Sequence, residues 1–351
     1  MGSSVFDRGD GTRRIPEEIA LRILHVSNNA LPDMRVEKTA WTLRKHGHEN
    51  HFVGPESRQY LGAFDKLHTY SHGGYVKTVF DLSRRHRLRK IVESVRPDII
   101  VANNIVSAKD FIDSRIPLVY DDHEYWSMSV KSDPSYTKDL PMRVRSAPFR
   151  YLVPRWERQI VSKFVTIVTH EAVAEEYRKY TEWVGVVPNY PLMDMVRGLN
   201  LRQPRQGVVY SGCDFRRNRF SPIRDMTGLR GHVEFDVICG LPHRQMMERL
   251  TQYRVGLTPW RFHLVHLYKD QNRNYEYFHA GLQVIMNRQL ARRFQHLKFV
   301  HSYDDYSELP DLIRNLPDID PEEIAGHAQR NYVWELNEKT ILEACERALR
   351  K

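Results

Sequence analysis

The sequence predicts an α/β protein with two domains, each built around a parallel β-sheet. The chain has 351 residues, which exceeds the usual size of one hydrophobic core and, at about 150 residues per domain, indicates two domains. Strand-like apolar runs alternate with helical patterns along most of the chain, which is typical of parallel sheets. A turn-rich stretch at residues 184–191, followed by a polar stretch at 199–206, divides this series into two halves.

The first half begins as strand, helix and strand. Residues 21–27 are a short β-rich run, followed by turn-forming residues. A helix is predicted from Val36, because apolar residues recur at helical spacing, the last turn is basic and Gly47 supplies a stop. The elements expected next are a strand at 51–53, a helix at about 76–95, and strands at 98–102 and 116–120.

The first half ends with helical signals over residues 147–180, interrupted by a β-branched run at 164–169. The second half repeats the alternation, with strands expected at 207–212, 232–239, 255–257 and 282–286. The last segment, residues 335–349, is amphipathic and could pack back on the first domain. The predicted boundaries are a first domain at 20–190 completed by residues 335–351, a linker at 191–206, and a second domain at 207–334.

The composition limits the kinds of molecule that this protein is expected to bind. Apolar residues make up 41% and charged residues 28% of the chain, which is ordinary for a globular protein. The net charge of +9 favours polyanionic partners, namely nucleic acid, anionic lipid or phosphorylated small molecules. Nucleic acid is disfavoured, because the sequence has no RNP motif, zinc-finger spacing or Gly-rich RNA loop.

The cysteines and the apolar runs bear on location. Cys213, Cys239 and Cys345 have neither metal-ligand spacing nor an even disulfide framework, which favours a reducing cytoplasm. The longest apolar runs have strand length, far below the roughly 20 residues that span a bilayer. Residues 1–19 are polar and Gly-rich without a signal-peptide core, so we expect a tail outside the fold, either disordered or added to the natural chain.

One segment of the second half has the features of an anion site. Residues 270–272 are turn formers before a predicted helix that Gly281 ends, and Arg273 lies in its first turn. A diphosphate could bind this helix start. The alternative is that Arg273 and Glu276, spaced i,i+3, form a surface salt bridge, with Tyr275 in the core.

His123 is the candidate site residue of the first half. It closely follows a predicted strand that ends at Tyr120, at the carboxyl edge where α/β proteins hold ligands. The alternative is an ordinary loop histidine beside acidic neighbours. No metal site is expected from Asp121, Asp122 and Glu124, because adjacent carboxylates alternate in direction along an extended chain.

Seven segments, taken in order, resemble the family 4 glycosyltransferases. They are residues 23–27 (ILHVS), 33–37 (DMRVE), 46–54 (HGHENHFVG), 119–124 (VYDDHE), 187–191 (VPNYP), 210–212 (YSG) and 272–284 (NRNYEYFHAGLQV). No single segment is decisive, and the resemblance rests on their order and spacing over nearly the whole chain after residue 20.

The resemblance implies the GT-B fold, which is two facing Rossmann-like domains. It also implies a retaining, metal-independent enzyme of the hexosyltransferase type, which moves a sugar from a nucleotide-diphosphate donor to a glycan or lipid-linked acceptor. No cofactor is expected besides the donor. Breaking the bond to a nucleotide diphosphate leaves developing negative charge on phosphate, which cations and helix N-termini stabilise.

The resemblance further implies roles for individual residues. The predicted catalytic residues are His123, which would position the donor sugar, and Glu276, which would bind the donor sugar or its ribose; Glu124 is second choice to His123. The predicted donor-binding residues are Gly212, Arg216, Arg217, Asn272, Arg273 and Tyr275. Each charge-assisted contact to the diphosphate would contribute about 1.5–3 kcal/mol.

The chain departs from the family pattern at four places. Asn28 and Asn29 replace a frequent glycine pair, Tyr268 replaces the first of two glutamates, Gln283 replaces a frequent proline, and no Lys-Gly follows residues 210–212. Two alternatives therefore stay open: a nucleotide-sugar epimerase of related fold, and a catalytically degenerate GT-B binding protein.

Two basic stretches of the first domain predict contact with an anionic membrane surface. The first runs from Arg84 to Lys90, and the second runs from Arg143 to Arg158 and interleaves basic with aromatic residues. Such stretches fit anionic lipid, at about 1 kcal/mol per basic residue, or a phosphate-carrying acceptor. The alternative is a solvated helix face. We therefore expect a cytoplasmic protein, with peripheral attachment to the inner face of the membrane as a further expectation.

Overall fold

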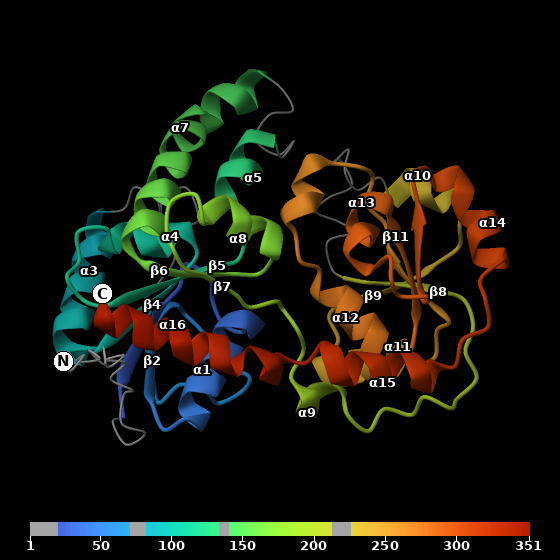
Figure 1. The fold of residues 1–351 in the computed structure, drawn as a ribbon, viewed down its shortest axis with the longest axis horizontal. Coiled ribbons are helices and arrows are strands. Elements are labelled where there is room, and N and C mark those ends of the chain that lie inside the picture. Colours follow the sequence, from blue (N-terminus) through green and yellow to red (C-terminus); the bar gives the residue numbers. More distant parts are fainter. Residues whose placement is uncertain (1–19, 71–81, 133–139, 213–225) are drawn as a thin grey trace, which may run out of the picture.

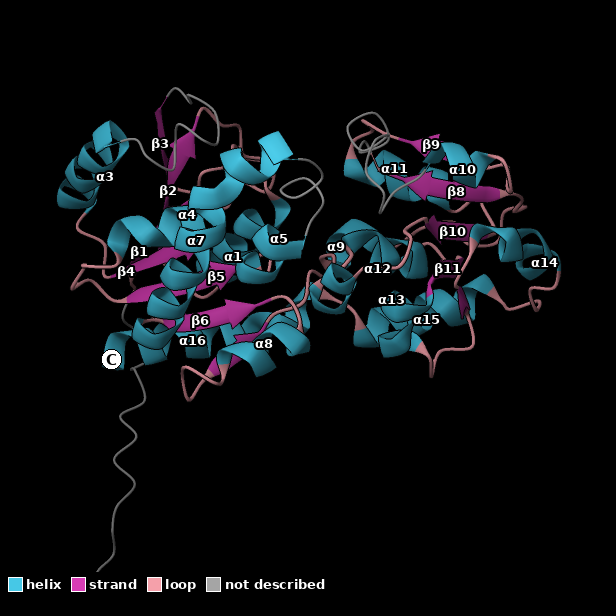
Figure 2. Ribbon diagram, turned by 90° about the horizontal axis from the view of Figure 1, so that it is seen from above, coloured by secondary structure: helices cyan, strands magenta, loops and turns pink. Residues whose placement is uncertain are grey.

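The protein has two α/β domains, side by side in Figure 1. A computed structural model describes residues 20–70, 82–132, 140–212 and 226–351. Every described strand pair is parallel. Helices lie on both sides of the sheets when the molecule is turned by 90° (Figure 2). The predicted fold class is confirmed.

The first domain is built on a sheet of seven strands. They are β1 (Arg22–Val26), β2 (Glu49–Pro55), β3 (Lys66–Tyr70), β4 (Ile99–Asn103), β5 (Leu118–Asp122), β6 (Val165–Val168) and β7 (Val184–Val186), in the order β3-β2-β1-β4-β5-β6-β7. The helices are α1 (Met34–Lys45), α3 (Leu82–Val95), α4 (Ile105–Ala108), α5 (Trp126–Ser132), α7 (Leu140–Lys163) and α8 (Glu171–Tyr177), with the 3-10 turn η1 (Lys109–Phe111).

The second domain is built on a sheet of five strands. They are β8 (Val208–Ser211), β9 (Asp236–Ile238), β10 (Val255–Thr258), β11 (Gln283–Asn287) and β12 (Val300–Tyr303), in the order β12-β11-β10-β8-β9. The helices after β7 are α9 (Met193–Val196), α10 (Met226–Arg230), α11 (His243–Leu250), α12 (Asn272–His279), α13 (Arg288–Ala291), α14 (Leu309–Arg314), α15 (Pro321–Asn331) and α16 (Glu338–Arg350). The 3-10 turns are η3 (Leu264–Tyr268), η4 (Arg292–Phe294), η5 (Tyr306–Glu308) and η6 (Trp334–Asn337).

Helix α1 shows how local sequence sets an element. Its start is Met34, two residues before the predicted Val36, because the Asp33 side chain caps the helix by accepting from the Arg35 and Val36 amides. The φ of Gly47, just past the end, is +82°, a left-handed conformation that glycine adopts without steric cost.

The last helix, α16, packs on the first domain as predicted. Its buried residues Ile341, Ala344 and Cys345 share a core with Ile23 of β1 and Ile99 of β4. In Figure 1 the chain passes from α15 on the second domain through η6 into α16, which runs across the first domain.

The chain crosses between the two cores at residues 192–196. Leu192 packs in the core of the first domain, whereas Val196 packs in that of the second. Arg205, which lies inside the segment predicted as linker, donates to the backbone oxygens of Tyr253 and Ala280 in the second domain. The crossing therefore lies ahead of most of that segment.

The structure differs from the expectations about the cysteines and the basic helix face in two details. Cys239 is disulfide-bonded, so the cysteine pattern gives no support to a reducing compartment. Arg84, predicted in a basic lipid-facing stretch, is 1% exposed and pairs with Asp110 at 2.5 Å. Helix α3 turns Arg84 and Leu88 inward together, because positions four apart share one helix face.

Candidate active site

A cavity of about 440 Å³ lies between the two domains. His123, which follows β5, and Gly212, which follows β8, both line it, so the carboxyl ends of the two sheets face the same opening. The full lining is His123, Glu124, Asn189, Ser211, Gly212, Met246, Trp260, Lys269, Asp270, Gln271, Asn272, Arg273 and Glu276.

The start of α12 presents positive charge to this cavity. Gln271 is the N-cap residue, and Asn272 and Arg273 form the first turn. The Arg273 guanidinium lies 4.5 Å from the centroid of the Tyr210 ring, which belongs to β8. A cation and the unpaired amides of a helix start therefore lie together at the cavity wall, an arrangement that suits an anion.

Gly212 permits the close approach of Arg273. Its φ is +152°, and a Cβ atom there would lie 2.9 Å from the Tyr210 hydroxyl and 3.0 Å from Nη2 of Arg273. Tyr277 on α12 fixes the preceding residue, because its hydroxyl accepts from the Ser211 amide at 2.8 Å. A glycine in β10 makes room for that ring, since a Cβ at Gly256 would lie 2.4 Å from it.

Glu276 lines the cavity one helical turn after Arg273. Its Oε1 lies 3.2 Å from Nε2 of His243, the first residue of α11, and both side chains are largely buried. Arg273 and Glu276 both line the cavity and contact Tyr210 and His243, which does not fit the alternative of a salt bridge on an outer surface.

The structure does not bring Tyr275 to the cavity. The residue is 1% exposed, and its ring packs edge-on against Tyr190 with 4.7 Å between centroids. Its hydroxyl donates to Oδ1 of Asp270 at 2.7 Å. Tyr275 lies one position before Glu276 on α12, so it points about 100° away from Glu276 around the helix axis. Arg216 and Arg217, the other predicted donor-binding residues, lie outside the described residues.

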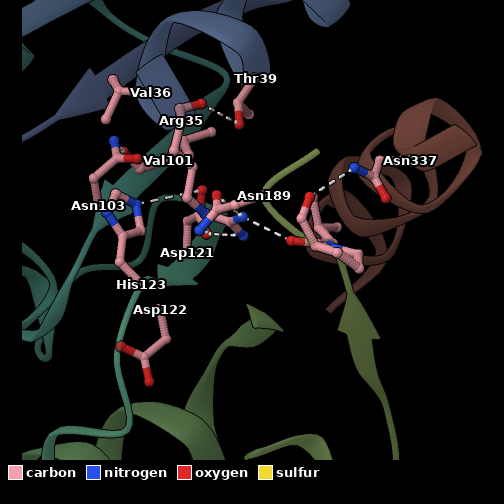
Figure 3. A network of polar contacts seen from close by, with 12 residues as sticks. Arg35, Val36, Thr39, Val101, Asn103, Asp121, Asp122, His123, Asn189 and Asn337 are labelled. Atoms are coloured by element: carbon pink, nitrogen blue, oxygen red, sulfur yellow. Dashed lines mark hydrogen bonds and ion pairs between the residues drawn. The ribbon is translucent and has the colours of Figure 1, made fainter. Parts of the chain in front are cut away.

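His123 is held by a buried charge network (Figure 3). Its Nε2 lies 3.7 Å from Oδ2 of Asp121, whose Oδ1 accepts from Nε of Arg35 at 2.8 Å. Burial alone would raise the pKa of Asp121, but the charges of Arg35 and His123 outweigh it and hold the pKa at about 2. Asp121 is therefore an anion that faces His123.

The same network reaches the interdomain crossing. Nη1 of Arg35 donates to the Val187 oxygen at 2.7 Å and to Oδ1 of Asn189 at 3.0 Å. The Asn189 amide in turn donates to Oδ2 of Asp270 in the second domain at 2.8 Å. Asn337, on the returning chain, donates to the Pro188 oxygen at 3.0 Å, as Figure 3 shows. One network of hydrogen bonds and ion pairs thus joins α1, β5, the two segments that connect the domains, and the cavity wall.

The three adjacent carboxylates near His123 diverge. Asp121 faces Arg35, Asp122 accepts from the Tyr177 hydroxyl at 2.5 Å, and Glu124 faces Lys269. Among the described residues, no group of three His, Cys, Asp or Glu side chains could hold a metal ion.

A further buried carboxylate, Glu157, lies near enough to the end of β5 for its charge to act on Asp122. Glu157 of α7 is 3% exposed and accepts from the Ser127 amide with both oxygens, at 3.2 Å each. Burial raises the pKa of Glu157 to about 7. Burial, and then the charge of Glu157, raise the pKa of Asp122 well above its usual value.

The raised pKa values of Glu157 and Asp122 predict that the free energy of unfolding falls as pH rises. A carboxyl with a raised folded-state pKa contributes stability below its unfolded value, and the contribution is lost as pH rises through about 7. Glu157→Gln should therefore flatten the pH dependence by about 1–2 kcal/mol between pH 5.5 and 8.5, measured by urea unfolding. Exposed Glu175→Gln is the control, and equal slopes in wild type and Glu157→Gln would contradict the prediction.

Several site residues were missed by sequence reasoning. Lys269, His243 and Asn189 were not proposed, and Asp270 was seen only as a turn former. Asn189 lies inside residues 187–191, and Asp270 lies just before residues 272–284, and both of these segments carry the resemblance. Their position in the sequence was therefore the signal that could have identified them. His243 had none, since it lies 33 residues from its partner in sequence.

Comparison with known proteins agrees with this geometry. The family model described as Glycosyltransferase Family 4 matches residues 34–190. No curated protein matches the chain by sequence. In fold, the chain is similar to sucrose-phosphate synthase from Thermosynechococcus elongatus, with a TM-score of 0.64 at 12% identity over 93% of this chain and 98% of that chain.

Two further solved structures are similar. HepE (Alr3699) from Anabaena, in complex with UDP and glucose, has a TM-score of 0.58 at 14% identity over 93% of this chain and 99% of that chain. A UDP-N-acetylglucosamine 2-epimerase has a TM-score of 0.52 at 10% identity over 93% of this chain and 95% of that chain. Identities this low show a common fold and nothing finer. The chain therefore matches the Glycosyltransferase Family 4 model over most of its first domain, and as a whole it has the GT-B fold.

Proposed function

We propose that this chain is a retaining glycosyltransferase that moves a sugar from a nucleotide-diphosphate donor to a glycan or lipid-linked acceptor. The observation that carries the proposal is the cavity between the domains, where Gly212, Arg273 and Glu276 of the second domain face His123 and Glu124 of the first. A diphosphate would bind at the start of α12, and the sugar would lie toward His123. HepE, one of the similar structures, holds UDP and glucose.

The test is titration of nucleotides by calorimetry. Uridine, guanosine, adenosine and cytidine diphosphates should each be tried, alone and as sugar conjugates. We expect one base to bind and its sugar conjugate to be consumed with release of free diphosphate. If none of them binds, the proposal fails.

A nucleotide-sugar epimerase is the alternative, because one of the similar structures is an epimerase. Epimerisation needs no acceptor and gives a new sugar nucleotide, whereas transfer releases free nucleotide diphosphate. Proton NMR of the products distinguishes the two.

The proposed transfer needs no metal ion. Arg273 and the α12 start supply positive charge at the cavity. We therefore expect turnover to persist in excess EDTA. Loss of turnover in EDTA that Mg²⁺ restores would contradict this part of the proposal.

Helix α7 is the proposed membrane-facing surface. Among the described residues it exposes Leu140 (73%), Val144 (66%) and Tyr151 (58%), and the Arg155 guanidinium lies 3.6 Å from the Tyr151 ring centroid. Apolar and basic side chains on one helix suit the surface of an anionic bilayer. Among the described residues, no helix is long and apolar enough to span a membrane.

Flotation with lipid vesicles tests this surface. The protein should bind vesicles that contain phosphatidylglycerol more strongly than pure phosphatidylcholine vesicles. Reversing two charges, Arg143→Glu with Arg155→Glu, should abolish that preference. Reversing two exposed charges of the second domain, Arg249→Glu with Arg314→Glu, is the matched control, and equal loss in both variants would show only a net-charge effect.

A further inference from the structure

Three consecutive residues of the second domain, Tyr268 to Asp270, each contact the first domain beside the cavity. The Tyr268 ring packs edge-on against Tyr125, with 4.9 Å between centroids. Oδ2 of Asp270 accepts from the Asn189 amide at 2.8 Å. Between them, Nζ of Lys269 lies 3.9 Å from Oε2 of Glu124. The backbone that carries Lys269 is therefore fixed on both sides.

The contact between Lys269 and Glu124 differs from that of Asp270 in its exposure and in how its charges are paired. The Asp270 side chain is 1% exposed and also accepts from Arg293 at 2.7 Å, so its charge is neutralised within the protein. Lys269 and Glu124 are 21% and 45% exposed, and their separation is at the outer limit of an ion pair. Exposed pairs of this kind contribute about 0–1 kcal/mol, so exchanging Glu124 for another anion costs little.

The charged residues that line the cavity favour the replacement of Glu124 by a bound anion as the partner of Lys269. Among the acidic residues of the lining, Asp270 is paired with Arg293 and Glu276 with His243. Lys269 and Arg273 are cations of the same lining. An ammonium group is a point charge with three donors, which suits phosphate oxygens.

We propose that Lys269 is a diphosphate-binding residue of this site, and that Glu124 is the partner it exchanges for the incoming phosphate. This inference rests on the proposed function and extends it. No lysine follows residues 210–212, where the resemblance would place a Lys-Gly. Lys269 supplies a second cation near Arg273 from a different segment, and its release frees the Glu124 carboxylate on the opposite wall of the cavity.

The experiment measures affinity for inorganic pyrophosphate and for nucleoside diphosphates by calorimetry at low salt. The variants are Lys269→Met, Lys269→Arg, Glu124→Gln and the double variant Lys269→Met with Glu124→Gln. The controls are Lys179→Met and Glu176→Gln, which remove the same charges from an ion pair outside the cavity lining. Thermal unfolding of each variant checks that the protein is folded.

Lys269→Met should weaken pyrophosphate binding by about tenfold or more, whereas Lys269→Arg should keep most of the affinity. Glu124→Gln should strengthen binding severalfold, and this gain should shrink in the Lys269→Met background, because Glu124 competes for Lys269. Unchanged affinity in Lys269→Met, or an equal gain from Glu124→Gln in both backgrounds, would overturn the proposal.

Failure of this inference can be distinguished from failure of the proposed function. Pyrophosphate binding that depends on Lys269, without transfer from any donor, would support this inference and count against the enzyme. Transfer with an unchanged donor KM in Lys269→Met would do the reverse.

Discussion

Replacing Arg35 by Met should lower the free energy of unfolding by about 3–5 kcal/mol, because it strands a buried charge. The Arg35 and Asp121 side chains are 4% and 0% exposed, and Nη2 of Arg35 lies 2.6 Å from Oδ1 of Asp121. The substitution also removes the donors to the Val187 oxygen and to Asn189. Urea unfolding at pH 7.5 measures the loss.

Two comparisons isolate the cause of this loss. Arg85→Met breaks an exposed pair with Asp113 and should cost less than about 1 kcal/mol. Adding Asp121→Asn to Arg35→Met should recover part of the stability, since the uncompensated charge disappears. Equal losses from Arg35→Met and Arg85→Met would contradict the prediction.

The pH dependence of the loss has a definite sign. In the wild type, the depressed pKa of Asp121 contributes stability above its ordinary value of 3.8, and the contribution is lost as pH falls through about 2. Without Arg35, burial raises this pKa, so Asp121 takes up a proton in mild acid. The loss caused by Arg35→Met should therefore be smaller at pH 5 than at pH 7.5.

Local patterns predicted the parts of this fold that local physics determines. The period of buried residues placed α1 and α16, and the glycine after α12 placed the end of that helix. The strands with continuous apolar burial, such as β4, were found because both of their faces are covered. The short strand β9 was overextended, because its flanking residues are equally β-prone in isolation.

The candidate site could be predicted only in part. His123, Asn272 and Arg273 were predicted as site residues and line the cavity. They could be predicted because residues at strand ends and helix starts often bind ligands in α/β proteins. Partners that are distant in sequence were not, since Arg35 and Asp121 lie 86 residues apart and Asn189 and Asp270 lie 81 apart. Tyr275 fits the same motif as Glu276, and the packed structure decides for the alternative read from its helical spacing, because its ring faces the core.

Arg273→Ala and Glu276→Gln should each lower turnover at least tenfold while the melting temperature stays within a few degrees. The reason is that both side chains line the cavity and neither belongs to the core: Arg273 is half-buried over Tyr210, and Glu276 is 18% exposed beside His243. A tenfold loss corresponds to about 1.4 kcal/mol of transition-state stabilisation, which is close to the lower end of the range for one charge-assisted hydrogen bond.

Asn274, which lies between them on α12, provides the control for this prediction. It is 2% exposed, and its Oδ1 accepts from the Thr258 hydroxyl at 2.6 Å, so it fastens the helix to β10. Asn274→Ala should therefore lower the melting temperature, because it leaves a buried hydroxyl without its acceptor. If Arg273→Ala and Glu276→Gln instead lost stability as Asn274→Ala does, their role would be to hold α12 in place, and a diphosphate would have no reason to bind there. If Arg273→Ala and Glu276→Gln kept their stability and lost turnover, while Asn274→Ala lost stability, the chemistry would belong to the face of α12 that meets the cavity.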